Sequence, residues 1–439
     1  MRSICHASTF CLFALICAVP GLVLGAAAPL TAEMAVERAL ANSPELSAET
    51  EEIKGLHEAA EKIPLLANPI LELEGKSGAI TNSPDEKSAS IAILQEIPLS
   101  AAASRRRAVA RADAAAVGLR LEERKLRLAD LVRRIWSASV IEQQRLELLG
   151  TQTEVVERLL KIAQERFTAG DLPEFEVQLA QLELHRQTLR QTEQQAALLS
   201  IRRQLATLLG LPGEQELPPL APATLPTPTL LADEQLLTLA TQRRPDLAAM
   251  KKEAERDEAS LSLAKAEAFP SLTLGLSYSN ERSSQNAYDL QGGLLVAGKE
   301  RTNDHILGLK LSIPLPLFSR NQAEVAKATG RVNANHQRVA AVHRTARAEL
   351  RDLLAQHRLA ITALELHRST LGPVARENLI TQEAAFTLGE IGIQPVLDEK
   401  RRLAEQQDAE LKALQMALET DSRLIAAVGG RLTDRGDTP

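Results

Sequence analysis

The two halves of this chain carry the same landmarks in the same order. "SPELSAETEEIKGLHEAAEKIPLLANPILELEG", residues 43–75, matches "RPDLAAMKKEAERDEASLSLAKAEAFPSLTLGL", residues 244–276, in its prolines and alternating leucines. Farther along, "IPL" at Ile97 recurs at Ile313, and "RFTAGDL" at Arg166 is matched by "AFTLGEI". An ordered series of this kind indicates a tandem duplication of about 200 residues. The chain must therefore build the same unit twice.

Each unit is expected to contain a short helix, a second helix of about 23 residues, two strands, one very long helix, a glycine turn and a returning helix. Gly170 and Gly389 mark the two hairpin turns. We expect the following boundaries: signal peptide 1–27; first repeat 28–210, with strands about 69–98 and a helical hairpin about 100–209; proline-rich linker 211–230; second repeat 231–429, with strands about 270–315 and a hairpin about 319–428; flexible tail 430–439.

The long helices carry a coiled-coil pattern. From Val132 to Phe167, mostly apolar residues follow a 3-4 spacing, which is the seam of a coiled coil. A helix from Ser100 to Thr168 would span about 100 Å at 1.5 Å per residue. The returning helix is shorter, so we expect it to stack end to end with the helix from Pro44 to Leu66 alongside that long neighbour. The second repeat follows the same plan, with a helix from Pro245 to Ala268 in the place of Pro44–Leu66.

The strand segments alternate with a period of two. In "SLTLGLSYS", Leu272, Leu274, Leu276 and Tyr278 share one face, and the first-repeat segments alternate more weakly. Two interpretations fit this pattern. One is a hairpin of a soluble sheet, and the other is a membrane barrel with an apolar face toward lipid and a polar face toward the lumen. Four strands cannot close a barrel, so the second interpretation requires several copies.

Prolines stand where strand gives way to helix. Pro98 ends the strand pair of the first repeat, and Pro314 and Pro316 end that of the second. Proline removes a backbone donor and disfavours helix at the preceding residue. We therefore expect these prolines to mark the junctions between the barrel and the helices.

The N-terminus predicts export. Arg2 precedes an apolar run that ends near Ala26–Ala28, the pattern of a secretory signal peptide. All three cysteines lie inside it, so the exported chain would have no disulfide. Acylation at Cys17 is the alternative, although Ile16 stands where a small residue is expected. After this segment, no apolar run is long enough for a transmembrane helix.

The sequence contains no catalytic constellation, and we expect no enzyme, no cofactor and no bound metal. His336, His343 and His357 are spaced too widely on one helix to share an ion, and we expect them to be solvated. No basic block interleaved with aromatics indicates nucleic acid. Four carboxylates near the hairpin turns are candidates for the channel entrance: Asp171, Glu174, Glu390 and Asp398. They are either solvated charges at helix starts or an anionic ring that favours cations.

Together, the duplicated plan, the paired prolines and the two glycine turns resemble the TolC-type outer-membrane factor family over essentially the whole exported chain. "NPILELE" at Asn68 and "IPLPLFSRNQ" at Ile313 are most similar to its cobalt–zinc–cadmium efflux branch. The resemblance implies a mainly α protein with four β-strands per protomer, assembled as a trimeric α-barrel and β-barrel channel. Of the two aspartates that the family often carries at the helical tip, this chain keeps only Asp398, with Pro395 in the other position.

The resemblance also implies a function and partners. It implies the exit duct of a tripartite efflux system for heavy-metal cations, in the outer membrane of a Gram-negative bacterium with a long periplasmic extension. The partners would be two further copies, a periplasmic adaptor, an RND-type inner-membrane transporter and outer-membrane lipid. A drug-efflux or type I secretion duct would have the same fold. A periplasmic coiled-coil adaptor is the alternative from a different class, but it would carry one hairpin rather than two.

Overall fold

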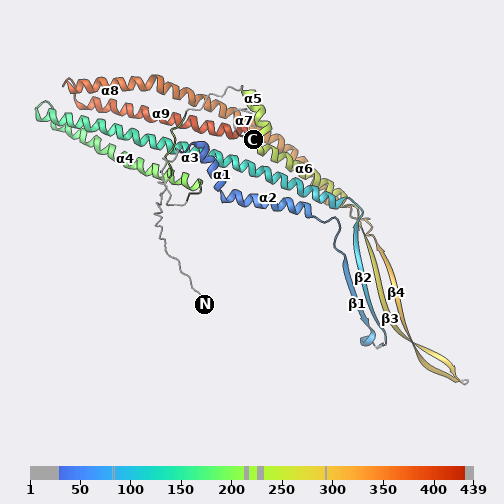
Figure 1. Cartoon of the computed structure of the whole chain (residues 1–439). Helices are drawn as coiled ribbons and strands as arrows, with labels where there is room; N and C mark the ends of the chain where they lie inside the picture. Colours follow the sequence, from blue (N-terminus) through green and yellow to red (C-terminus); the bar gives the residue numbers. More distant parts are fainter. Residues whose placement is uncertain are drawn as a thin grey trace, which may run out of the picture.

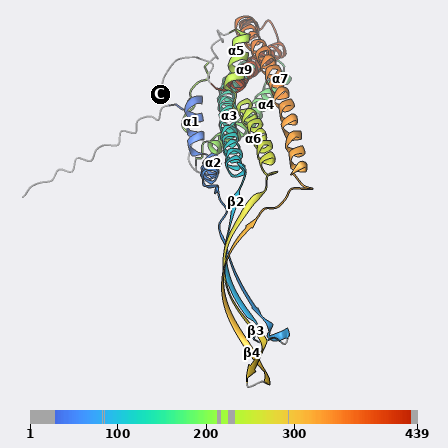
Figure 2. The same cartoon turned by 90° about the vertical axis from the view of Figure 1, so that its right-hand side faces the viewer.

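A computed structural model describes residues 29–81, 83, 85–211, 217–224, 232–291 and 294–430. The molecule is elongated, with two helical hairpin turns at one end and a narrow twisted sheet at the other (Figures 1 and 2). The expected signal peptide and tail lie outside the described residues. The first repeat consists of α1 (Ala32–Asn42), α2 (Pro44–Lys62), β1 (Ile70–Ser77), the 3₁₀ turn η1 (Gly78–Thr81), β2 (Lys87–Pro98), α3 (Ala102–Thr168) and α4 (Glu174–Leu208).

The second repeat follows the same order of elements, as the duplication predicts. It consists of α5 (Asp233–Arg243), α6 (Pro245–Ala266), β3 (Ser271–Gln291), β4 (Leu294–Ser312), α7 (Gln322–Leu366), the π-helical segment η2 (His367–Leu371), α8 (Gly372–Thr387) and α9 (Ile393–Val428). The long helix of this repeat is therefore divided, whereas α3 runs uninterrupted for 67 residues. Gly372 and Pro373 follow η2 directly, and proline is a common cause of such an interruption because it removes a backbone donor.

Local chemistry explains most helix ends. Pro44 and Pro245 occupy the first turns of α2 and α6, where the missing N–H costs nothing. α2 ends at Lys62, earlier than the expected Leu66, because Ile63 precedes Pro64 and is disfavoured in helix. α6 likewise ends at Ala266, two residues before the expected end.

Glycine ends the hairpin helices in both repeats. Gly170 and Gly389 have φ of 83° and 82°, the left-handed conformation that glycine adopts without strain. The residue after each glycine donates its N–H to the carbonyl five residues back, Asp171 to Arg166 at 2.9 Å and Glu390 to Ala385 at 3.0 Å. This is the Schellman arrangement expected for such caps. The predicted glycine turns are confirmed.

The four strands form one antiparallel sheet in the order β1-β2-β3-β4. One cross-strand row joins Leu71, Ile93, Leu276 and Leu309, and the next apolar row joins Leu73, Ile91, Tyr278 and Leu307. The row between them joins Glu72, Ala92, Ser277 and Gly308. Paired residues on neighbouring strands share a face. The predicted alternation therefore becomes one apolar and one polar face across all four strands.

The helical body has its own apolar core, made largely of leucine and alanine. Near one end of that core, α1 packs on α3, and the Trp136 indole Nε1 donates to the Leu30 carbonyl at 2.9 Å. Leu217 and Leu220, from the linker, pack into the same cluster. The described part of the linker therefore covers the first repeat rather than only spacing the two repeats.

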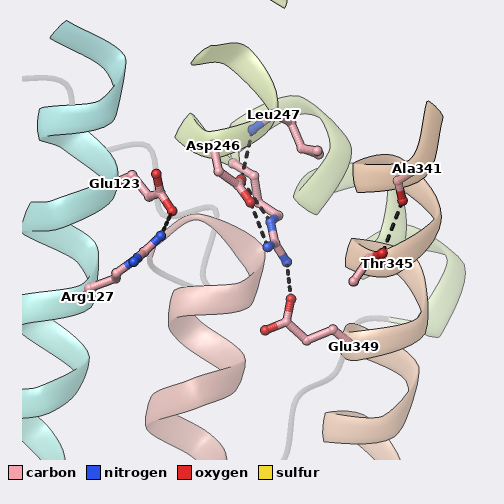
Figure 3. A network of polar contacts seen from close by, with 8 residues as sticks. Glu123, Arg127, Asp246, Leu247, Ala341, Thr345 and Glu349 are labelled. Atoms are coloured by element: carbon pink, nitrogen blue, oxygen red, sulfur yellow. Dashed lines mark hydrogen bonds and ion pairs between the residues drawn. The ribbon is translucent and has the colours of Figure 1, made fainter. Parts of the chain in front are cut away.

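A polar network joins α6 to α7 (Figure 3). The Arg244 guanidinium donates two hydrogen bonds to Asp246, at 3.1 and 2.8 Å, and one to Glu349 at 2.8 Å. Burial alone would lower the pKa of Arg244, but these two carboxylates outweigh it and raise that pKa. Nearby on α3, Arg127 pairs with Glu123. The network holds the start of α6 beside the middle of α7.

The expectation of three solvated histidines is wrong for His357. His336 is exposed, but His357 is buried between α7 and α9, with its Nδ1 at 3.2 Å from Thr420 Oγ1. Burial lowers the pKa of His357. Among the described residues, no helix combines the length and apolar character needed to cross a bilayer.

Candidate channel entrance at the helical tip

The two hairpin turns share one apolar cluster at the tip of the molecule. Side chains from α3, α4, α8 and α9 and from the first turn form it: Leu159, Ala163, Leu172, Val177, Ala180, Leu379, Phe386, Ile393, Val396 and Leu397. Because both repeats contribute, the turns α3–α4 and α8–α9 form a single packed end (Figure 1). The tip is therefore one structural unit.

Arg166 ties the first hairpin to the second. Its Nη1 donates to the carbonyl of Phe386 at 3.0 Å and to that of Ile391 at 3.3 Å. Its guanidinium also lies 5.0 Å from the centroid of the Phe386 ring, a cation–π contact. Phe386 is fully buried, whereas Phe167, its repeat equivalent, is 45% exposed. Of these two equivalent phenylalanines, only Phe386 is packed inside the tip.

Glu176 makes a second link between the hairpins. Its Oε2 accepts a hydrogen bond from the Ile393 N–H at 2.8 Å, at the first residue of α9. The residue before the helix, Gly392, has no side chain that can cap this end. A carboxylate from α4 therefore satisfies one of the free N–H groups of α9, where the helix dipole also favours negative charge.

A buried charged cluster lies just inside the apolar tip. Glu183 of α4 is 1% exposed and lies 3.5 Å from Lys400 Nζ and 3.0 Å from Arg401 on α9. Burial lowers the pKa of Lys400 to about 8, although Glu183 opposes the shift. Gln187, one turn farther along α4, is fully buried, and its side-chain amide has no hydrogen-bond partner among the described residues. The cluster is thus a polar layer between the hairpins.

The four predicted entrance carboxylates lie at or near the tip but do not form one cluster. Asp171, Glu174 and Glu390 are exposed on the turns or at the start of α4. Asp398, in the second turn of α9, pairs with Arg401 at 3.2 Å and accepts from Gln394 at 3.0 Å. No group of three or more potential metal ligands occurs in the described part of the chain.

The predicted junction prolines lie between sheet and helix. Pro98 is the last residue of β2, and Pro314 and Pro316 stand between the end of β4 and the start of α7. The α7 N-terminus is positioned by Asn321, which has φ of 60° and whose Nδ2 donates to the Ala264 carbonyl at 2.8 Å. The second junction is thus fixed against the end of α6.

Comparison with known proteins identifies this architecture. Residues 236–430 match the family model described as "Outer membrane efflux protein". The second repeat of the chain is thus similar to the outer membrane efflux protein family. The chain is 24% identical over 390 residues to the cobalt-zinc-cadmium resistance protein CzcC of Cupriavidus metallidurans, covering 88% of this chain and 86% of that protein.

Solved structures share the fold of this chain. The outer-membrane channel OprN superposes with a TM-score of 0.74 at 16% identity, covering 91% of this chain and 90% of OprN. CusC superposes with a TM-score of 0.72 at 17% identity, covering 91% of this chain and 92% of CusC. OprN is described as an outer-membrane channel, and the CusC structures are described in terms of transmembrane channel formation. The mainly helical fold with a four-stranded sheet is therefore confirmed.

Several tip residues were not predicted from the sequence: Arg166, Glu176, Glu183 and Lys400. The sequence of α4 contained part of the information needed to find this buried polar contact. The buried positions of α4 run Val177, Ala180, Glu183 and Gln187, so two polar residues continue an apolar helix face. Such a substitution of polar for apolar residues in a seam indicates a buried polar contact, but it does not name the partner on the other hairpin.

Proposed function

We propose that three copies of this chain form a channel through the outer membrane of a Gram-negative cell, the exit duct of a tripartite efflux system for heavy-metal cations. One observation carries the proposal. The sheet has an apolar face across all four strands, yet β1 and β4 lie at its edges without a further described partner strand. Unpaired backbone groups in lipid cost several kcal/mol each, so neighbouring copies must pair these edges.

The number of strands supports a trimer. Four strands are too few to close a barrel, since about eight is the smallest number that leaves room for side chains. Three copies would supply about twelve, with β4 of one copy beside β1 of the next and the polar face turned to the lumen.

Like the sheet, the helical body has two sides at which neighbouring copies could pack. α3 and α9 lie at its centre, while α4 and the α7–α8 helix lie at the sides (Figure 1). On α4, Phe175, Leu182 and Leu189 are exposed at heptad spacing, a stripe that suits a neighbouring helix. In a closed ring, this stripe would face the α7–α8 edge of the next copy.

The α7–α8 edge carries its own exposed apolar stripe: Leu359, Leu366, Val374 and Leu388. Its spacing grows by one residue between Leu366 and Val374, across η2. A π-helical turn accommodates one extra residue, so η2 keeps Val374 on the same face as Leu366. We regard this compensation as support for a continuous helix-packing edge.

Heavy metal is the proposed cargo because the CzcC protein, by its name, provides cobalt, zinc and cadmium resistance. Three exposed carboxylates of the tip (Asp171, Glu174 and Glu390) and the partly exposed Asp398 suit cations, because like charges around a narrow mouth raise the local cation concentration. An adaptor and an RND-type transporter would complete the system. Drug efflux or type I secretion through the same duct is the second candidate, since both use this fold.

Two measurements test the proposal. Cross-linking of outer-membrane fractions should give a trimer, and the purified trimer should conduct in planar bilayers. A cell that lacks the gene should lose tolerance to cobalt, zinc and cadmium and regain it with the wild-type chain. A monomer free in the periplasm would contradict the channel, whereas a loss of drug tolerance alone would favour the second candidate.

A further inference from the structure

A cavity of about 350 Å³ lies where the sheet meets the helices. The β2–α3 junction forms one wall, with Leu99, Ser100 and Arg105, and the last turns of α6 and the residues after it form the other, with Ser262, Lys265 and Phe269. It lies at the opposite end of the helical body from the tip and its carboxylates. No part of the proposed channel mechanism uses it.

The lining of the junction cavity is cationic and hydroxylated. Arg105 donates a hydrogen bond to the Ser262 hydroxyl, which holds this guanidinium between α3 and α6. Lys265 is exposed and forms no ion pair within the described part of the chain. The nearest acid in the sequence, Glu267 just after α6, is already bound by Arg106 at 3.1 and 2.7 Å. The cavity therefore offers two cations without a carboxylate in its lining.

Apolar side chains stand beside these cations. Leu99 is 57% exposed and Phe269 is 66% exposed, an arrangement that nothing within the protomer explains. Ile97 pairs with Leu272 on the apolar face of the sheet. Leu99 follows Ile97 by two residues, and Phe269 precedes Leu272 by three. The offset of two keeps Leu99 on the apolar face, so this face continues past β2 to the edge of the cavity, where Phe269 of the opposite wall is also exposed.

The position of the cavity relative to the apolar band of the sheet indicates what kind of ligand can reach it. The apolar rows extend from Leu272 to Tyr278, a length of about 20 Å at about 3.4 Å per residue. Beyond Tyr278 the same face turns polar, with Asn280 and His305 paired. Because the strands of a barrel are tilted by about 35–45°, this band covers more than half of the roughly 25 Å apolar height of a membrane barrel. The cavity lies just past its helical end, where lipid headgroups would begin.

We infer that the junction cavity binds an anionic phospholipid of the leaflet that faces the helical body. Arg105 and Lys265 pair with the phosphate, the Ser100 and Ser262 hydroxyls provide further polar contacts, and Leu99 and Phe269 pack against the acyl chains. Guanidinium and ammonium groups are the usual protein partners of phosphate, and basic side chains at a membrane surface attract anionic lipid. This inference rests on the proposed function, since it needs the sheet in the membrane.

Lipid retention by purified trimers tests the inference. Wild-type trimers are exchanged into nanodiscs or detergent that contain phosphatidylglycerol or phosphatidylcholine, and the bound lipid is measured by native mass spectrometry. The trimers should retain phosphatidylglycerol and should retain phosphatidylcholine several-fold less. Lys265→Gln should lower phosphatidylglycerol retention several-fold. Lys251→Gln is the matched control, because it removes the same charge from an exposed position on the same helix, about 21 Å away at 1.5 Å per residue. The control should retain lipid as the wild type does.

The outcomes separate this inference from the proposed function. If both variants insert and conduct normally but retain phosphatidylglycerol equally, the lipid site is overturned and the channel stands. If inorganic phosphate alone displaces the lipid completely from wild-type trimers, a free-phosphate site replaces it. A wild-type chain that never enters the membrane fraction would overturn both. Arg105→Gln, a second variant from the opposite wall, should reproduce the loss seen with Lys265→Gln.

Discussion

At the helical tip, Phe386, Ile393 and Val396 are completely buried by the chain itself, whereas in the sheet Leu73, Leu307 and Leu309 are 72%, 74% and 76% exposed. Both regions are rich in apolar side chains placed at regular spacing. The tip packs two hairpins against each other, while the sheet is a single layer with nothing covering either face within the protomer (Figure 2).

This difference shows where each region obtains its stability. Burial of apolar surface inside the protomer stabilises the tip directly. The apolar face of the sheet gains nothing comparable until lipid covers it, and its edges gain hydrogen bonds only from further copies. Substitutions in the sheet should therefore affect assembly, and substitutions in the helical body should affect the stability of the protomer.

The largest effect is expected for a charge on the apolar face of the sheet. Leu274 pairs with Gln95 and Leu311 on that face, and Thr273 lies on the other. Leu274→Arg should sharply reduce the trimer yield in the membrane, since an arginine in the lipid band costs about 2–4 kcal/mol for each copy. Thr273→Arg, the control, should assemble nearly as the wild type does. Equal yields from quantitative membrane fractionation would show that the two faces are assigned wrongly.

The next effect is expected in the buried cluster of the tip. Glu183→Ala leaves Lys400 buried without its carboxylate, and breaking such a pair costs about 3–5 kcal/mol. The double variant Glu183→Ala with Lys400→Met should recover much of this loss, because it leaves no unpaired charge. Thermal unfolding of the wild type, Glu183→Ala, Lys400→Met and the double variant measures the coupling free energy between Glu183 and Lys400. Glu174→Ala, at an exposed position of the same helix as Glu183, is the control and should leave the stability nearly unchanged. If the stability losses of the two single variants simply add in the double variant, Glu183 and Lys400 are not coupled.

A smaller and pH-dependent effect is expected at Asp421 of α9. Burial, with a contribution from Glu33, raises its pKa to about 6, and Arg133 opposes the shift. A carboxyl whose folded pKa is raised costs stability above that pKa, and the cost disappears as the pH falls below the unfolded value of about 4. Asp421→Asn should therefore stabilise the protein at pH above about 7, by on the order of 1–3 kcal/mol, and not at pH about 4.

The melting temperature of Asp421→Asn measured across this pH range checks the sign. Asp352→Asn, at an exposed position of α7, is the matched control and should follow the wild-type curve. A gain from Asp421→Asn that is the same at both ends of the range would mean that ionisation of this carboxyl is not its cause.

The smallest effect is expected at Asp398. If this carboxylate contributes to an anionic entrance, Asp398→Asn should lower the preference of the reconstituted channel for cations over anions and leave the trimer yield unchanged. The change should be modest, because Arg401 lies 3.2 Å from Asp398 and offsets part of its charge, and salt should weaken it further. Reversal potentials in a salt gradient measure it. Unchanged selectivity would make Asp398 an ordinary solvated helix charge.

The sequence by itself determined the features that depend on neighbouring residues along the chain. The order of elements follows from the duplication, the turns at Gly170 and Gly389 from the left-handed φ that glycine tolerates, and the two faces of the sheet from the alternation of β3 and β4. These properties need no knowledge of the packing partner, which is why they could be predicted.

Only the tertiary structure decided which of two similar residues is buried. Phe167 and Phe386 occupy equivalent turns, but the Arg166 guanidinium lies against the Phe386 ring, and Phe386 is buried while Phe167 is exposed. The burial of His357 and the pairing of Glu183 with Lys400 likewise depend on α9 lying beside α7 and α4. A repeat carries the same local pattern twice, whereas burial depends on neighbours that the two copies do not share.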